Sequence, residues 1–211
     1  YINPSNPAQS REMYSWLKQQ PNVAAILPNW QVAVTLQGWP AEVFGIIDHA
    51  YYRQHWPLLE ATGDDAWEQL ARSDALMLSE QLARRLNVRL GDHLTLPTPN
   101  GPWSPRIVGI YADYGNPKGH LLVNINHLLR GWPQLTPNRF NLRIEPQNIP
   151  GFLAALQTRF QLDDSRIVDQ ARLKGWSVQV FERTFAATAA LNSLTLAVAG
   201  VALFMAIFLV G

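Results

Sequence analysis

The chain has 211 residues, of which 16% are charged, and its formal net charge is +1. A charge this close to neutral gives no electrostatic footprint for nucleic acid, so we expect no nucleic-acid partner. Cysteine is absent, which excludes disulfides, thiol redox chemistry and thiolate metal sites.

The first third of the chain predicts a helix followed by a β-hairpin. Residues 10–19 place apolar side chains on one helical face, and Pro21 ends that helix. Two strands are expected next, over residues 23–36 with a break at Pro28 and over residues 41–47, joined by a turn at residues 37–40. Residues 51–59 are aromatic and are expected to be irregular.

The middle of the chain predicts short helices and strands in alternation. Asp65 and Glu68 form a capping-box pattern for a helix through residue 71, and Ser79 is expected to cap a second helix that ends at residue 86. Asn100 and Gly101 indicate a hairpin loop. The strands expected around these features cover residues 75–78, 93–96 and 106–111.

The same mixture continues to residue 168. Residues 113–119 are rich in turn-forming residues. A helix is expected to start at Asn148, with Pro150 in its first turn. The other expected elements are strands over residues 121–125, 140–144 and 167–168 and a helix over residues 126–130. This order predicts an α+β fold, which could divide into two subdomains, and argues against a doubly wound parallel sheet.

The C-terminal residues predict a transmembrane helix over residues 190–211. Residues 184–211 contain no charged side chain. About 20 apolar residues at ~1.5 Å rise per residue span the ~30 Å hydrocarbon core of a bilayer. A buried core helix is the alternative. The apolar residues expected in the span are Leu191, Leu194, Leu196, Val198, Val201, Leu203, Phe204, Ile207, Phe208 and Leu209.

A stalk helix over residues 175–189 is expected to join this span to a folded domain over residues 1–174. Its apolar residues recur at helical spacing, and its last charge precedes the apolar run. The residues expected to couple domain and membrane are Trp176, Val180, Phe181, Arg183 and Phe185. Because the chain starts at Tyr1 and stops with the apolar run, we interpret it as a fragment of a larger membrane protein. A tail-anchored protein is the alternative.

No catalytic pattern stands out. The five histidines lack the HExxH spacing, and neither GxSxG nor GxxxxGK[ST] occurs. Asp163 and Asp164 are typical of a solvated turn. The one polar cluster to follow is Asp113, Lys118 and His120, for which a tight β-turn loop is the simpler interpretation. We therefore expect no catalytic, cofactor-binding or metal-binding residues.

Three segments together resemble a known family. Residues 78–86, 90–96 and 107–111 form a helix, a Gly-Asp turn with a strand, and a second strand. Their order resembles the extracytoplasmic domain of FtsX-like, MacB-type ABC transporter permeases. Residues 181–185 before the apolar run are similar to the point where that family's domain joins its membrane helices.

The resemblance implies a non-enzymatic, MacB-like periplasmic core domain of a permease in the bacterial inner membrane. It implies membrane lipid, a cytoplasmic ABC ATPase subunit and a second permease copy as partners. A periplasmic partner, or a lipid, lipoprotein or peptide cargo, would complete the system, and the domain would serve export or mechanotransmission. Two alternatives remain open: a membrane-anchored hydrolase that uses the loop from Asp113 to His120, and a bitopic protein of a secretion or division complex.

Overall fold

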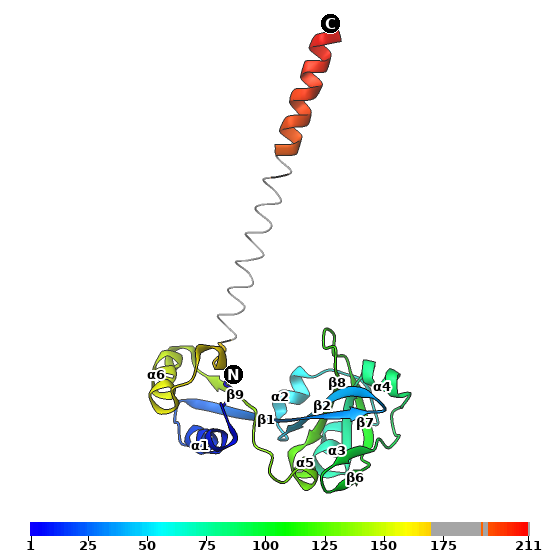
Figure 1. The fold of residues 1–211 in the computed structure, drawn as a ribbon, viewed down its shortest axis with the longest axis vertical. Helices are drawn as coiled ribbons and strands as arrows, with labels where there is room; N and C mark the ends of the chain where they lie inside the picture. Colours follow the sequence, from blue (N-terminus) through cyan, green and yellow to red (C-terminus); the bar gives the residue numbers. More distant parts are fainter. Residues whose placement is uncertain (170–190, 192–193, 211) are drawn as a thin grey trace. The chain divides into compact units, whose positions relative to one another are not determined.

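The computed structural model describes residues 1–169, 191 and 194–210. The chain divides into two compact units, Tyr1–Ile167 and Val168–Gly211. The first unit carries a mixed sheet with helices packed against it (Figure 1). The helices are α1 (Pro7–Lys18), α2 (Ala50–His55), α3 (Ala66–Arg72), α4 (Glu80–Leu86), α5 (Ile125–Gly131) and α6 (Ile149–Phe160), with 3-10 turns η1 (Pro146–Asn148) and η2 (Asp164–Arg166).

Seven of the strands form one sheet in the order β3-β7-β4-β8-β2-β1-β9. The pairs β2–β8 and β4–β7 are parallel, and the other pairs are antiparallel. A separate hairpin consists of β5 and β6. The strands are β1 (Val23–Leu36), β2 (Trp39–Ile46), β3 (Leu58–Ala61), β4 (Ala75–Ser79), β5 (Leu96–Thr98), β6 (Gly101–Trp103), β7 (Arg106–Tyr111), β8 (Gly119–Asn124) and β9 (Arg139–Ile144). This mixed sheet confirms the predicted α+β fold.

Two hydrophobic cores cover the two faces of the central strands. Along β4, Leu76 and Leu78 belong to one core, and Ala75 and Met77 belong to the other. This alternation follows from the two-residue period of a strand. Helices α4 and α5 contribute to the first core, and α2 and α3 contribute to the second. Because both faces are covered, every residue of β4 is buried.

A third core lies at the β9 end of the sheet. It contains Met13 and Leu17 from α1, Phe140 from β9 and Phe152 and Leu156 from α6. Strand β1 links this core to the other two, because it changes partner along its length. Residues 23–29 pair with β9, and residues 30–36 pair with β2.

The predicted break at Pro28 is wrong, because β1 runs through it. Pro28 stands opposite Phe140 of β9. The backbone N–H and C=O of Phe140 bond to Ile2, on the side of β9 away from β1. In an antiparallel pair, the residue opposite then also points its N atom away from the partner strand. Pro28 therefore removes no ladder hydrogen bond, and the strand tolerates it.

The predicted hairpin is confirmed, but its turn is tighter than expected. Leu36 pairs directly with Trp39. The two residues between them, Gln37 and Gly38, both have positive φ, at 49° and 81°. This is the backbone of a type I′ turn, whose twist matches that of the flanking strands.

Residues 51–59, expected to be irregular, instead form most of α2 and the start of β3. The capping box at Asp65 is also wrong, although α3 itself is confirmed. Asp65 makes no side-chain capping bond in the described structure. Glu68 pairs instead with Arg53 of α2, at 3.1 Å.

The strand expected over residues 93–96 is mostly absent from the described fold. Only Leu96 lies in a strand, and His93 forms a single bridge with Arg106. Strand β7 pairs with β3 and β4 instead. The strand expected over residues 167–168 is reduced to one bridge between Ile2 and Ile167.

In the second unit, residues 194–210 are helical, and their apolar side chains are exposed. Among the described residues, no helix meets the length and apolarity needed to cross a membrane. The transmembrane helix over residues 190–211 stays a prediction. The stalk residues Trp176, Val180, Phe181, Arg183 and Phe185 lie outside the described residues.

Candidate functional site

The loop from Asp113 to His120, the candidate for catalysis, is a tight turn held by its own side chains. Asp113 Oδ2 accepts from Asn116 Nδ2 at 3.1 Å, and the Lys118 backbone N–H donates to Asn116 Oδ1 at 3.1 Å. The Lys118 ammonium donates to Glu42 of β2, at 3.2 Å. The three residues that are close in sequence thus have different partners.

His120 lies inside an aromatic cluster. Its ring stacks on Phe44 and on Trp56, with centroid distances of 4.2 and 5.9 Å. Its Nδ1 atom forms a hydrogen bond with the hydroxyl of Tyr111. Burial lowers the pKa of His120, although Asp113 and Glu42 oppose this shift. Burial, followed by the charge of Asp113, raises the pKa of Tyr111 well above its usual value.

The histidine ring is therefore neutral near pH 7 and mostly closed to solvent, with 6% of the residue exposed. A general base needs hydrogen-bond reach to a substrate proton. Here the ring stacks on Phe44 and Trp56, and its Nδ1 atom is already bonded to the buried hydroxyl of Tyr111. The geometry therefore supports a packing role for His120 and gives no support to the hydrolase alternative.

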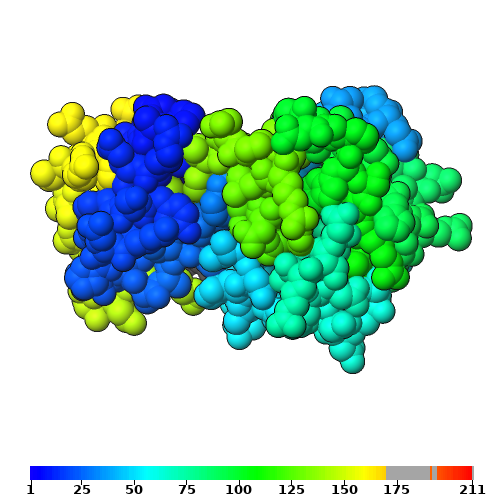
Figure 2. Space-filling model, turned by 90° about the horizontal axis from the view of Figure 1, so that it is seen from below, coloured from blue at the N-terminus to red at the C-terminus, as the bar shows by residue number. Residues whose placement is uncertain are grey.

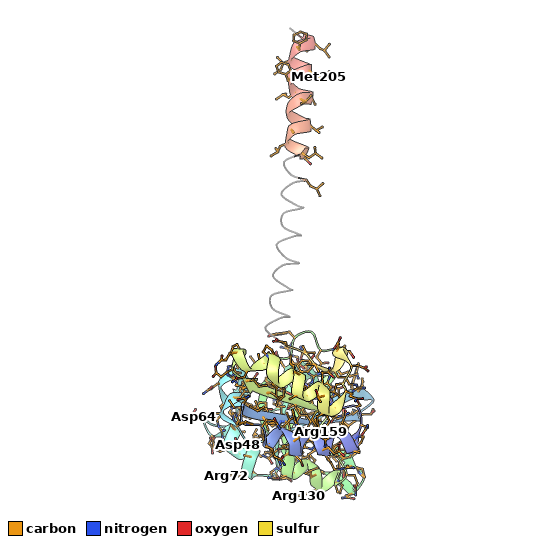
Figure 3. All side chains as sticks on the ribbon, turned by 90° about the vertical axis from the view of Figure 1, so that its left-hand side faces the viewer. Asp48, Asp64, Arg72, Arg130, Arg159 and Met205 are labelled. Atoms are coloured by element: carbon orange, nitrogen blue, oxygen red, sulfur yellow. The ribbon has the colours of Figure 1, made fainter. Side chains whose placement is uncertain are left out.

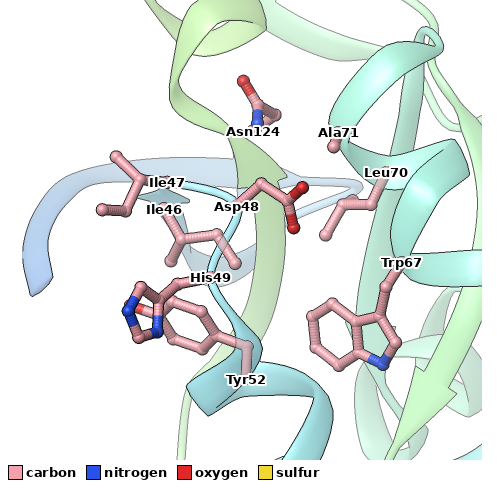
Figure 4. Close-up of a pocket in the computed structure, with 9 residues that line it drawn as sticks. All are labelled: Ile46, Ile47, Asp48, His49, Tyr52, Trp67, Leu70, Ala71 and Asn124. Atoms are coloured by element: carbon pink, nitrogen blue, oxygen red, sulfur yellow. The ribbon is translucent and has the colours of Figure 1, made fainter.

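A small hollow near α2 is equally unsuited to a substrate (Figure 4). Its volume is about 10 Å³, which is room for about one water molecule. Its polar side chains already have structural partners: His49 Nδ1 accepts from the Tyr51 backbone N–H at 3.1 Å, and Asp48 pairs with Arg53 at 2.6 Å. Leu70 and Trp67 supply apolar lining.

The remaining histidines are dispersed. His55 and His93 each place Nδ1 at 3.0 Å from a backbone oxygen, of Tyr51 and Ser104 respectively. His127 is buried, and within the described residues its Nδ1 has no hydrogen-bond partner. No group of three histidine or carboxylate side chains able to hold a metal occurs in the part of the chain that the structure describes.

The feature most suited to a function lies where the first unit begins and ends. We call it the terminal clasp and define it as residues 1–4, 139–140 and 166–167. Ile2 and Phe140 exchange both backbone hydrogen bonds, at 2.9 and 2.8 Å. On its other side, Ile2 forms an antiparallel bridge with Ile167. One residue thus joins β9 to the end of the first unit.

One more backbone hydrogen bond and two arginine side chains reinforce the clasp. The Asn3 backbone N–H donates to Arg166 O at 2.8 Å, and Arg166 Nη1 donates to Pro4 O at 2.9 Å. Arg139 Nε donates to Asn3 Oδ1 at 3.1 Å, and its guanidinium lies 3.9 Å from the ring centroid of Tyr1. Bonds from charged donors are stronger than neutral ones. The segment that enters the first unit and the segment that leaves it are therefore fixed side by side.

Sequence analysis did not find the clasp, because its parts are far apart along the chain. The only local signal is an isolated Ile2 among polar residues and prolines. In the structure, Ile2 is 2% exposed and belongs to the third core.

Comparison with solved structures identifies the fold. The chain is similar to the extracellular domain of the ABC-type transporter YknZ from Gram-positive bacteria, with a TM-score of 0.54 and 14% identity, over 78% of this chain and 94% of that domain. It is also similar to the periplasmic region of MacB from Actinobacillus actinomycetemcomitans, with a TM-score of 0.49 and 14% identity, over 77% of this chain and 84% of that region. No protein-family model and no curated protein sequence matches the chain.

The YknZ comparison confirms the fold that the family resemblance implied. The chain has the fold of the extracellular domain of the ABC-type transporter YknZ. At this identity, the likeness carries the fold alone.

Proposed function

We propose that this chain is the extracytoplasmic part of an ABC-type permease, a non-catalytic transporter component. The observation that carries the proposal is the fold shared with 94% of the YknZ extracellular domain. The domain would belong to a protein of the bacterial inner membrane and would face the periplasm. The span predicted over residues 190–211 would anchor it. The packing role of His120 agrees with this, because it leaves the loop from Asp113 without a catalytic arrangement.

The terminal clasp supports a route by which movement would reach the domain. Ile2 bonds to Phe140 of β9 and forms an antiparallel bridge with Ile167. A displacement of the segment at Ile167 would therefore reach β9 through Ile2. Strand β9 pairs with β1, and β1 continues into the central sheet. The stalk from Trp176 to Phe185 would deliver this displacement from membrane helices driven by a cytoplasmic ATPase subunit in a permease dimer. The displaced domain would then act on a lipid, lipoprotein or peptide cargo, or on a periplasmic partner.

The location can be tested by cysteine labelling, because the chain has no cysteine of its own. Tyr114 is 80% exposed. In the full-length protein, with any cysteine outside this chain replaced by serine, Tyr114→Cys should react with a membrane-impermeant maleimide in cells whose outer membrane has been permeabilised and whose inner membrane is intact. The matched control is Leu78→Cys, at a fully buried position, which should react only after denaturation. Labelling of Tyr114→Cys only after the inner membrane is broken would contradict an extracytoplasmic location.

The transporter role can be tested separately. The full-length protein is purified in mild detergent from its native membrane, and the proteins that remain bound are identified by mass spectrometry. We expect a stoichiometric subunit with the phosphate-binding sequence GxxxxGK[ST], the signature of an ATPase. A complex without any such subunit would argue for the assembly-protein alternative.

A further inference from the structure

An open groove of about 470 Å³ runs along the outer surface of α1 and reaches α6. It lies beside the third core, because its lining residue Trp16 packs on Phe152 and Phe160 of that core. Figure 2 shows the blue N-terminal residues beside the yellow residues of α6. Its lining combines one aromatic ring with charged and polar side chains. The lining residues are Arg11, Glu12, Ser15, Trp16, Gln19 and Arg159.

The aromatic ring of the groove is held in place from below. Trp16 is half-buried, and its ring contacts Phe152 and Phe160 of α6 with centroid distances of 5.8 and 5.5 Å. Its neighbours Met13 and Leu17 are buried and fix α1 on the third core. A ring fixed in this way presents apolar area at little entropic cost, a property of aromatic residues at binding surfaces.

The charges along the groove are mostly positive. Arg11 and Arg159 are exposed and form no ion pair within the described residues. Helices α1 and α6 together carry Arg11, Lys18 and Arg159 as basic residues against Glu12 alone. Arginine presents a planar fork that matches a carboxylate in a bidentate geometry. Two such forks at one aromatic surface suit a ligand that carries carboxylates and an apolar side chain.

We propose that this groove binds an acidic, amphipathic segment of a partner protein. An apolar side chain of the segment packs on Trp16, and its carboxylates bond to Arg11 and Arg159. An anionic bilayer fits less well, because a flat surface does not fill a groove and Glu12 repels phosphate groups. A protein segment can place a basic side chain opposite Glu12.

The proposal rests on the first unit alone and not on the proposed transporter role. Failure of the groove to bind peptide would leave the location and ATPase experiments unaffected. Conversely, a groove that binds acidic peptide would remain established if no ATPase subunit were found.

The test is selection from a displayed library of random peptides. The full chain, in nanodiscs of neutral lipid, is the bait. We expect the recovered peptides to be enriched in Asp and Glu next to apolar residues. The double variant Arg11→Ala with Arg159→Ala should bind them about tenfold more weakly, since two surface ion pairs are worth ~1–2 kcal/mol together.

The matched control removes two arginines elsewhere on the first unit, Arg72 of α3 and Arg89 after α4, both exposed. Arg72 and Arg159 are labelled in Figure 3. The control variant should keep the affinity of the unmodified chain, because the net charge changes equally and the groove does not. In the variant Arg11→Glu with Arg159→Glu, the selection should shift to basic peptides.

Three results would overturn the proposal. One is a selection that enriches no peptide. Another is a set of peptides whose affinity is the same for the groove variant and for the control. The third is binding to vesicles of anionic lipid that depends on Arg11 and Arg159 while no peptide binds, which would assign the groove to a membrane surface.

Discussion

Substitution of Ile2 by alanine should destabilise the first unit by ~2–3 kcal/mol. Ile2 is 2% exposed in the third core. The change removes three carbon groups at ~0.8 kcal/mol each, and measured Ile→Ala losses in cores span ~2–5 kcal/mol. We expect the lower part of that range, because a residue so near the start of the unit can move to close part of the cavity. The alanine backbone keeps both hydrogen bonds to Phe140, so the change isolates the side chain.

The measurement is urea unfolding of the full chain in a non-ionic detergent, followed by tryptophan fluorescence. Ile2→Val is the conservative companion, with an expected loss of ~0.5–1.5 kcal/mol. Leu59→Ala is the surface control, because Leu59 is 52% exposed, and should stay within ~0.5 kcal/mol of the unmodified chain. A decrease below ~1 kcal/mol in the free energy of unfolding of Ile2→Ala, with an unchanged slope against urea concentration, would refute this reasoning. The clasp would then not be stabilised by burial of the Ile2 side chain.

Three further predictions concern folding, pH and coupling. The fragment from Tyr1 to Lys174 should express as a soluble monomer with one cooperative unfolding transition, and insoluble product in several hosts would contradict this. Burial lowers the pKa of both His120 and His127 in the folded chain. As the pH falls, these histidines therefore bind protons in the unfolded chain at a higher pH than in the folded chain. Stability should therefore be complete above about pH 6.5 and should fall as the pH drops below it. A flat urea midpoint between neutral and mildly acidic pH would refute this. Insertion of Gly-Gly-Pro after Glu182, outside the described residues, should preserve folding and membrane insertion but abolish transport. Full transport activity would show that the stalk does not couple the membrane helices to the first unit.

The elements that sequence analysis located best are those whose cause is local. Strand β4 is a continuous apolar stretch, and the residues after it are good helix formers with an acidic start and a basic end. Such features need no distant partner to be recognised. Helix α2 was missed, because its aromatic residues follow no simple period and its Tyr52 is buried by contacts with distant elements, including Asn29 of β1.

The same limit applies to the candidate sites. Asp113, Lys118 and His120 were grouped because they are neighbours in the sequence. In the structure, the surroundings of His120 come instead from Phe44 of β2, Trp56 after α2 and Tyr111 of β7. Burial and partners of this kind depend on the topology of the sheet, which the sequence pattern does not specify. The clasp depends on it in the same way.

The change of partner along β1 also determines whether the first unit can be divided. Its third core suggests a separable part, but residues 23–29 of β1 have only β9 as a neighbour in the sheet. A version of the chain trimmed to the central sheet would keep these residues as a free edge that includes Ile26 and Leu27, both of the apolar kind. Exposed, apolar strand edges pair with other chains and aggregate. Strand β9 therefore protects this edge of β1 from pairing with other chains, and the first unit should be expressed and engineered whole.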